Sequence, residues 1–132
     1  MAQSTLRVAE NAPGDWFVDS TCIDCDACRQ IAPAVFRDAG DYSAVHHQPS
    51  TPFELLAAQK ALLTCPTASI GSETRTDMRG ALAAYPEVIA EDVYRCGFTS
   101  QSSFGAFSYL IRAARPARPA ALVGKASAGV FV

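Results

Sequence analysis

The sequence predicts a small domain that mixes short strands with helices, followed by a less regular extension. Its 132 residues suit one domain, or a small domain with an appendage. Hydrophobic residues make up 49% of the chain and charged residues 18%, which excludes a largely disordered, charge-solvated chain. Strand-like and helix-like segments alternate over the first 70 residues, and turn residues separate them.

Charge and hydropathy exclude two kinds of partner. The formal net charge is -2, whereas a broad nucleic-acid-binding surface would need clustered Lys and Arg. No apolar run approaches the roughly 18 residues of a membrane span. Residues 1–15 lack the apolar core of an export signal. We therefore expect a cytoplasmic protein without nucleic-acid or membrane partners.

The first expected elements are a strand and a short helix joined by a loop. Residues 16–19 have the apolar character of a short strand, and they lead into a loop over residues 20–28. A short helix can follow over residues 29–31. Pro33 would end it, because the residue before a proline avoids helical backbone angles.

A hairpin follows in the sequence. Residues 35–36 and 41–46 have strand character and flank a turn at residues 37–40. Gly40 can take the positive φ that such a turn needs. This pattern predicts two short antiparallel strands.

The next helix has the clearest sequence signals. Thr51 can cap its N-terminus, Pro52 suits its first position, and Glu54 completes a capping box. Its body, residues 55–63, repeats leucines at i and i+7, which predicts a leucine stripe facing the core. The Cys-Pro pair at residues 65–66 ends it.

The extension after residue 72 is less regular. A polar stretch at residues 71–76 marks its start, and a short helix is expected over residues 76–85. Strands are expected over residues 92–98 and 104–112, with a polar turn between them. Arg, Pro and Ala then dominate, which predicts a disordered tail at about residues 113–132. The aromatic residues of this part are expected to fill its core: Tyr94, Phe98, Phe104, Phe107 and Tyr109.

Five cysteines are the feature that points to chemistry. An odd number in a reducing compartment argues against a disulfide framework and indicates metal or redox chemistry. Cys22, Cys25 and Cys28 form a C-x2-C-x2-C run, so three thiolates can converge on one face of a tight loop. A cubane iron–sulfur cluster takes three ligands from such a run and a fourth from a distant cysteine. The candidate for the fourth is Cys65, and Pro66 keeps the helix from continuing past it.

The spacing predicts one cluster and not two. In two-cluster proteins the run continues as x3-C-P, and that fourth cysteine binds the other cluster. Here Ala32 takes its place before Pro33. Counting back from Cys65 with the same spacing gives only residues without a ligand atom: Ala61, Ala58 and Leu55. We therefore expect one cluster, with a packed helix in place of the second site.

Two other readings of the cysteines stay open. A structural zinc site usually has two separated C-x2-C pairs, and four buried structural thiols are the simplest alternative. If the group is an iron–sulfur cluster, a cysteine at position 25 gives every iron a ligand. This favours [4Fe-4S] over [3Fe-4S], although oxidation can remove one iron.

Residues 17–71, from F-V-D-S-T-C-I-D-C-D-A-C to L-T-C-P-T-A-S-I-G, resemble a single-cluster bacterial-type ferredoxin. The resemblance implies an α+β, ferredoxin-like 4Fe-4S fold of two βαβ-like halves within residues 1–72. It also implies a [4Fe-4S] cluster on Cys22, Cys25, Cys28 and Cys65. Its function would be single-electron transfer to and from a redox partner protein, a reductase or oxidoreductase.

Two acids stand between the expected ligands. Asp24 and Asp26 should disfavour the addition of an electron, which predicts a potential at the low end of the roughly -700 to +450 mV of iron–sulfur proteins. Loop N–H groups that bond to the sulfurs would oppose this effect. The acids could also steer a basic partner, or they could simply be solvated loop residues.

Residues 92–110 resemble the first strands of the metallo-β-lactamase-fold hydrolase that some proteins carry after such a ferredoxin module. The His-x-His-x-Asp-His metal motif of that family is absent, and no histidine follows His47. We therefore expect residues 73–132 to be an incomplete extension from a truncated or frame-shifted hydrolase. The alternative function is a redox-sensing or docking module for such a hydrolase, and a structural zinc-binding module is a third.

The remaining reactive side chains are not expected to carry chemistry. His46 and His47 are neighbours on a strand, so one should point outward and the other should pack. Cys96 lies far from the motif and is expected to be a buried structural thiol. The sequence contains no nucleophile elbow, phosphate loop or dinucleotide fingerprint, so we expect an electron carrier and not an enzyme.

Overall fold

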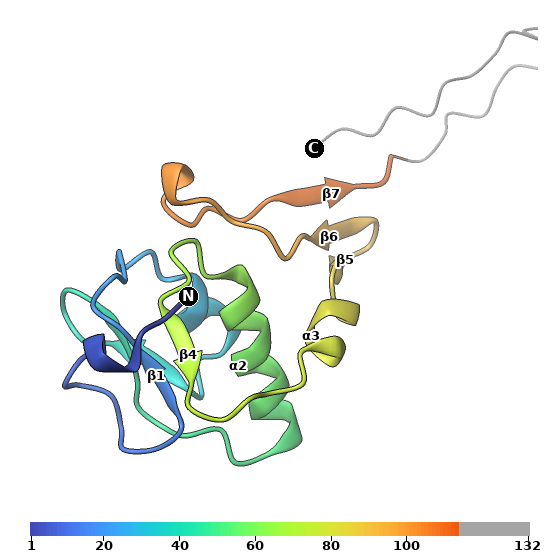
Figure 1. Ribbon diagram of the computed structural model, residues 1–132. Coiled ribbons are helices and arrows are strands. Elements are labelled where there is room, and N and C mark those ends of the chain that lie inside the picture. The colour runs from blue at the N-terminus through green and yellow to red at the C-terminus, as the bar shows by residue number, and fades with distance from the viewer. Residues whose placement is uncertain (114–132) are drawn as a thin grey trace, which may run out of the picture.

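Two helices and two pairs of short strands make up the first part of the chain (Figure 1). The computed structural model describes residues 1–113, so the expected tail lies almost entirely outside the described residues. A 3₁₀ turn precedes these elements at Ser4–Leu6 (η1). In chain order they are β1 (Trp16–Val18), α1 (Ala27–Ile31), β2 (Phe36–Asp38), β3 (Ser43–Val45), α2 (Pro52–Thr64) and β4 (Ile70–Ser72).

Strand pairing connects the beginning of this part to its end. β1 pairs antiparallel with β4, which places Val18 opposite Ile70. β2 pairs antiparallel with β3, which places Phe36 opposite Val45. The structure confirms a small domain that mixes helices and strands, with elements in the order strand, helix, strand, repeated once.

The hairpin differs from the prediction by two residues. Arg37 and Asp38, expected in the turn, belong to β2, and Asp38 lies opposite Ser43. The turn therefore lies at residues 39–42. Within it, the Gly40 N–H donates a 2.7 Å hydrogen bond to the carboxylate of Asp38. Gly40 has the expected positive φ, +95°.

The N-terminus of α2 follows the prediction closely. The Thr51 side chain accepts from the Glu54 N–H at 3.2 Å, and the Glu54 carboxylate accepts from the Thr51 N–H at 3.1 Å. Hydrogen bonds from the Ser50 N–H and hydroxyl, with that from Thr51, lower the pKa of Glu54 to about 2. Both bonds of the capping box are therefore present.

The predicted leucine stripe on α2 is wrong in part, because Leu62 packs against the core but Leu55 does not. The buried residues of the helix are Ala58, Gln59, Ala61 and Thr64, whereas Leu55 is exposed. Small side chains here let α2 approach the core and α1 closely. Leu56 instead faces the extension, where its Cδ1 lies close to Gly80.

The core lies between the helices and the paired strands. Its largest fully buried apolar side chains are Val18, Val35, Phe36 and Val45. Cys28 belongs to this core, and Cys22 and Cys65 pack against its edge. The cysteine-bearing loop therefore rests on the hydrophobic core.

The extension adds a short helix and a three-stranded antiparallel sheet in the order β5-β6-β7. Strand β5 was missed in the sequence, and the other strands are shorter than expected. The aromatic prediction is also wrong in part, since Phe98, Phe104 and Tyr109 are exposed. The elements are α3 (Arg79–Ala83), β5 (Glu87–Ala90), β6 (Val93–Arg95), the 3₁₀ turn η2 (Gln101–Ser103) and β7 (Tyr109–Ile111).

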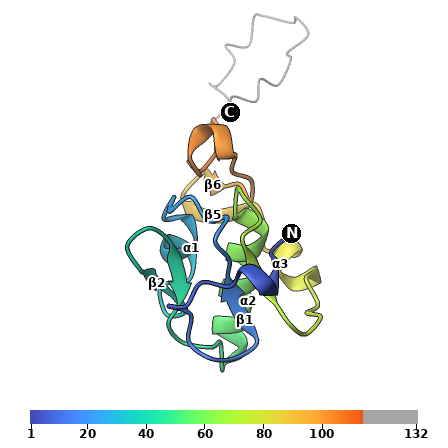
Figure 2. The same ribbon diagram turned by 60° about the vertical axis from the view of Figure 1, so that its left-hand side comes forward.

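The extension packs on α2 and reaches past its C-terminal end (Figures 1 and 2). Gln59 of α2 donates to the Thr76 hydroxyl at 2.6 Å, and Lys60 forms a 2.6 Å ion pair with Glu87. The Thr64 hydroxyl lies 2.9 Å from that of Tyr85. Within residues 1–113, no helix has the length and apolar character that crossing a membrane requires.

Candidate metal centre

The loop between β1 and α1 is coiled tightly by two left-handed residues. Asp24 has φ +54° and Asp26 has φ +67°, and aspartate tolerates this region better than most residues. Asp24 donates its N–H to the Cys22 sulfur at 3.4 Å. The three cysteines of the loop are thereby turned toward one side.

A buried carboxylate fixes the start of this loop. Asp19 is 1% exposed, and its oxygens accept hydrogen bonds from the Gln3 N–H at 2.8 Å and from the Thr21 N–H at 3.0 Å. The Thr21 hydroxyl also contacts Asp19 and lies 2.6 Å from that of Ser69. The sequence places Asp19 only at the end of a strand and gives no sign of this role, because Gln3 and Ser69 are distant in the chain.

Cys65 reaches the same place from the other side. It is the C-cap of α2, and the pairing of β1 with β4 brings the following turn back to the loop. The turn closes through Ala68, which has φ +52° and donates its N–H to the Cys65 carbonyl. The Ser69 N–H points at the Cys65 sulfur from 3.3 Å.

All four predicted cysteines line one cavity: Cys22, Cys25, Cys28 and Cys65. The cavity has about 310 Å³ of empty space, part of it open to solvent. Apolar side chains supply most of the remaining wall, including Val18, Ile23, Pro66 and Ile70. Cys65 thus lies with the other three despite the 36 residues between it and Cys28.

Burial changes the acidity of two of these thiols. It raises the pKa of Cys28 to about 12, although a hydrogen bond from Ser43 opposes the rise. Burial also raises the pKa of Cys25, against a backbone hydrogen bond from Ala27. These thiols keep their protons without a bound cation, so metal loading must release protons.

Arg29 neutralises part of the charge beside the cavity. Its Nη1 lies 2.6 Å from the Asp24 carboxylate and its Nε lies 2.6 Å from that of Asp26. The bond from Arg29, helped by Gln30, lowers the pKa of Asp26. Two acids therefore share one cation. The spacing of Arg29 three residues after Asp26 was the available signal for this pairing.

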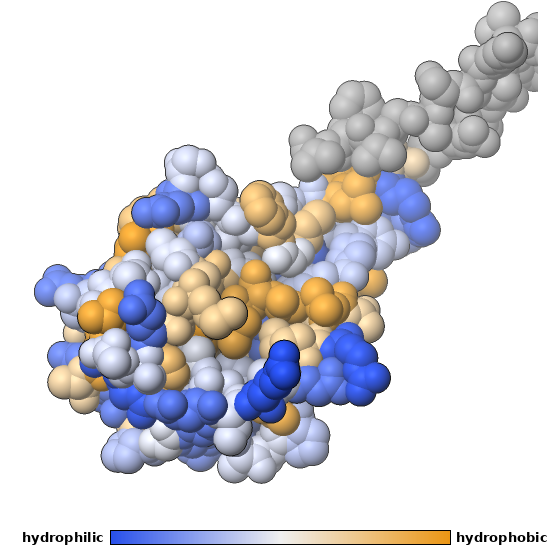
Figure 3. Space-filling view, viewed as in Figure 1, coloured by the Kyte–Doolittle hydropathy of each residue, from blue (hydrophilic) through white to orange (hydrophobic). Residues whose placement is uncertain are grey.

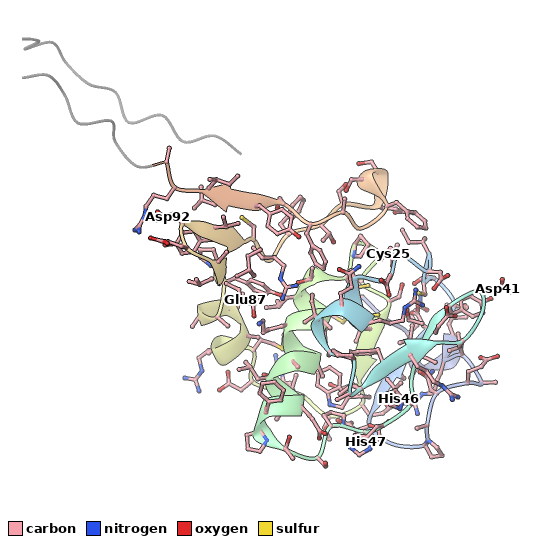
Figure 4. All side chains as sticks on the ribbon, turned by 180° about the vertical axis from the view of Figure 1, so that it is seen from behind. Cys25, Asp41, His46, His47, Glu87 and Asp92 are labelled. Atoms are coloured by element: carbon pink, nitrogen blue, oxygen red, sulfur yellow. The ribbon has the colours of Figure 1, made fainter. Side chains whose placement is uncertain are left out.

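The residues expected to be inert lie away from the cavity. Figure 4 shows His46 and His47 on the side remote from Cys25. Both histidines are exposed, so the expectation that one would pack is wrong. The His46 ring lies against the Pro33 carbonyl and the His47 ring lies near the Glu54 carboxylate, both at the surface. Cys96 is half-buried after β6 and does not line the cavity.

The ligand positions of a second centre hold apolar residues. Ala32, Ala58 and Ala61 are all buried in the core, and only Leu55 reaches the surface. The described residues also contain no group of three or more His, Cys, Asp or Glu side chains close enough to hold a single metal ion.

Comparison with protein families gave a match over the first part of the chain. Residues 18–72 match the model of a family described as the 4Fe-4S single cluster domain of ferredoxin I. This segment contains all four cavity cysteines, and its small mixed α/β structure is consistent with a ferredoxin-like domain. The extension from α3 onward lies outside the match. Neither the curated proteins nor the solved structures gave a match to the chain.

Proposed function

We propose that this protein is a single-electron carrier that holds one [4Fe-4S] cluster on Cys22, Cys25, Cys28 and Cys65. The observation that carries the proposal is the meeting of these four cysteines in one cavity, inside the segment that matches the ferredoxin family. The fold would then be the ferredoxin one, with two βαβ-like halves around the core. The described residues would act as ligands and insulation, with no catalytic group among them.

The donor set fits a cluster better than zinc. A zinc ion needs four ligands that all lie about 2.0 to 2.3 Å from one point. No three candidate ligands converge in this way among residues 1–113. A cubane assigns each thiolate to a different iron, so its ligands surround a wider space, as the four cysteines do around their cavity.

The chain itself would supply water exclusion and hydrogen bonds. When bound, the cluster would supply one-electron redox chemistry. Val18, Ile23 and Ile70 keep water from much of the cavity wall. N–H groups of Asp24 and Ser69 point at the Cys22 and Cys65 sulfurs, where they would stabilise negative charge.

The pairing of Arg29 with Asp24 and Asp26 weakens the effect that these acids were expected to have on the reduction potential. Unpaired, Asp24 and Asp26 would both disfavour an added electron. Paired with Arg29, they leave one net negative charge at this edge of the site. We propose a potential in the lower part of the iron–sulfur range, set more by burial than by these acids.

A second candidate function is a redox-sensing or docking module for a metallo-β-lactamase-fold hydrolase. The extension that suggested it packs beside the cysteine cavity, so a change at the cavity could reach it. In either case we propose a cytoplasmic location and a protein partner, a reductase or oxidoreductase for the carrier.

Anaerobic purification tests the proposal. We expect a coloured protein with four irons and four sulfides per chain, and an EPR signal after reduction. A colourless protein with stoichiometric zinc would refute the cluster. Repeated reduction and reoxidation by a ferredoxin reductase, without loss of colour, would support the carrier over the sensor.

A further inference from the structure

We propose that the extension completes the cluster site, with residues 99–105 forming a cap that shields Cys25. This inference rests on the proposed cluster. It assigns a role to a segment outside the family match, which ends at residue 72.

The closest approach is made by Gly105. This buried glycine has φ +73°, and a Cβ placed on it would lie 2.7 Å from both the Cβ and the sulfur of Cys25. It would also lie 3.6 Å from the Pro66 ring. The backbone at this position therefore lies directly against one ligand and the neighbour of another. Any side chain would push the cap away.

The cap has its own internal structure. Ser100 accepts the Ser102 N–H on its side chain at 3.2 Å, and its carbonyl accepts the Gly105 N–H at 3.0 Å. The backbone of Phe104 is also left-handed, with φ +53°, so the chain reverses direction at Phe104 and Gly105. Figure 4 shows Cys25 beneath this turn.

Two attachments hold the cap in place. Thr99 is buried, and its hydroxyl donates to the carbonyl of Thr64, the residue directly before Cys65. Earlier in the extension, Glu87 of β5 pairs with both Lys60 of α2 and Arg95 of β6. The cap is thus anchored beside one ligand while it covers another.

The shielding has a physical consequence for the cluster. Solvent exposure is one of the factors that set the potential of an iron–sulfur centre and its access to oxidants. Reduction adds negative charge, which water stabilises better than an apolar wall does. Opening the cap should therefore raise the reduction potential and speed the destruction of the cluster by dioxygen.

Two matched glycine variants test the cap. Gly105→Ala places a methyl group against Cys25, whereas Gly40→Ala places one at a position with φ +95° and nothing within 4 Å. Both variants carry the backbone strain of a positive φ, but only the first displaces the cap. We expect Gly105→Ala to lose its visible absorption in air several-fold faster than the wild type, with a higher potential. Gly40→Ala should match the wild type in both.

A third variant tests the cap if Gly105→Ala does not assemble a cluster. Thr99→Val removes the hydroxyl that bonds to Thr64 while keeping the shape of the side chain. It should also bleach faster than the wild type. The cap is refuted if the wild type holds its cluster and every assembled cap variant bleaches at the wild-type rate. A wild type without iron and sulfide would instead refute the proposed function.

Discussion

Nη1 of Arg29 lies 3.1 Å from the hydroxyl oxygen of Ser43, at the wall of the cysteine cavity. Ser43 is 1% exposed, and its hydroxyl accepts from Arg29 and donates to Cys28, lowering the pKa of that thiol against the larger effect of burial. A charged donor polarises the hydroxyl it bonds to. The Arg29 guanidinium is thereby linked to the buried Cys28 thiol through one serine.

Replacing Ser43 should weaken this link. In Ser43→Ala the Cys28 sulfur loses a donor, so negative charge on the cluster is less stabilised and the potential should fall. Folding stability should drop by about 1 kcal/mol for the lost hydrogen bonds. Potentiometric titration followed by EPR measures the first effect. Ser72→Ala removes an exposed serine hydroxyl and should leave the potential unchanged; equal potentials in all three proteins would disprove the link.

The ligand assignment predicts contrasting cysteine variants. Cys65→Ser removes a thiolate from the cavity, so iron and sulfide per chain should fall to a small fraction of the wild-type content. Cys96→Ser lies outside the cavity and should keep the full content. Iron and acid-labile sulfide analysis under anaerobic conditions distinguishes them. A full cluster in Cys65→Ser, or its loss in Cys96→Ser, would contradict the assignment.

The attachment of the extension depends on Glu87. Burial alone would raise its pKa, but hydrogen bonds from Lys60 and Arg95 outweigh this effect and lower it. Glu87→Gln leaves two half-buried cations without their counter-charge, which should cost about 1 to 3 kcal/mol of unfolding free energy.

The control for Glu87 is an exposed ion pair. Asp77 and Arg79 are both exposed, so Asp77→Asn should change stability by less than about 0.5 kcal/mol. Denaturant unfolding followed by circular dichroism measures both variants. A Glu87→Gln protein as stable as Asp77→Asn would show that the attachment contributes nothing.

The α2 capping box predicts an acid dependence. The pKa of Glu54 is lowered from 4.5 to about 2 in the folded protein. Its ionised form therefore stabilises the fold above pH 4.5, and this contribution is lost as the pH falls from about 4.5 to 2. The thermal unfolding temperature of Glu54→Gln should be lower than that of the wild type at pH 6, and the two temperatures should converge near pH 2. Acid releases a cluster from both proteins alike, so a gap that stays constant with pH would refute the role of Glu54.

Most of the parts that the sequence predicted well are local, and Cys65 is the exception, since the run of three cysteines calls for a distant fourth one. Cys22, Cys25 and Cys28 lie within seven residues, and Thr51 and Glu54 are three residues apart, so spacing alone describes them. The missed features join distant parts of the chain. Nothing in the local pattern around Gly105 or Asp19 shows that one will meet Cys25 and the other the Gln3 N–H.

The leucine error on α2 has a physical cause. Periodicity marks an apolar face but does not say which neighbour covers it. Alanines took the face toward α1, and Leu56 was left for the extension. The same limit applies to the aromatic side chains of the extension, which were expected in a core but are partly exposed. Figure 3 shows apolar surface spread over that region.

The buried alanines at positions 32, 58 and 61 set a limit on stoichiometry. If the cavity holds the proposed single cluster, each molecule would carry one reducing equivalent at a time. An acceptor that requires a pair of electrons must meet two copies of this protein, or meet the same copy twice. Its turnover should then depend on how fast the carrier exchanges, and should rise with carrier concentration until release from the acceptor becomes limiting.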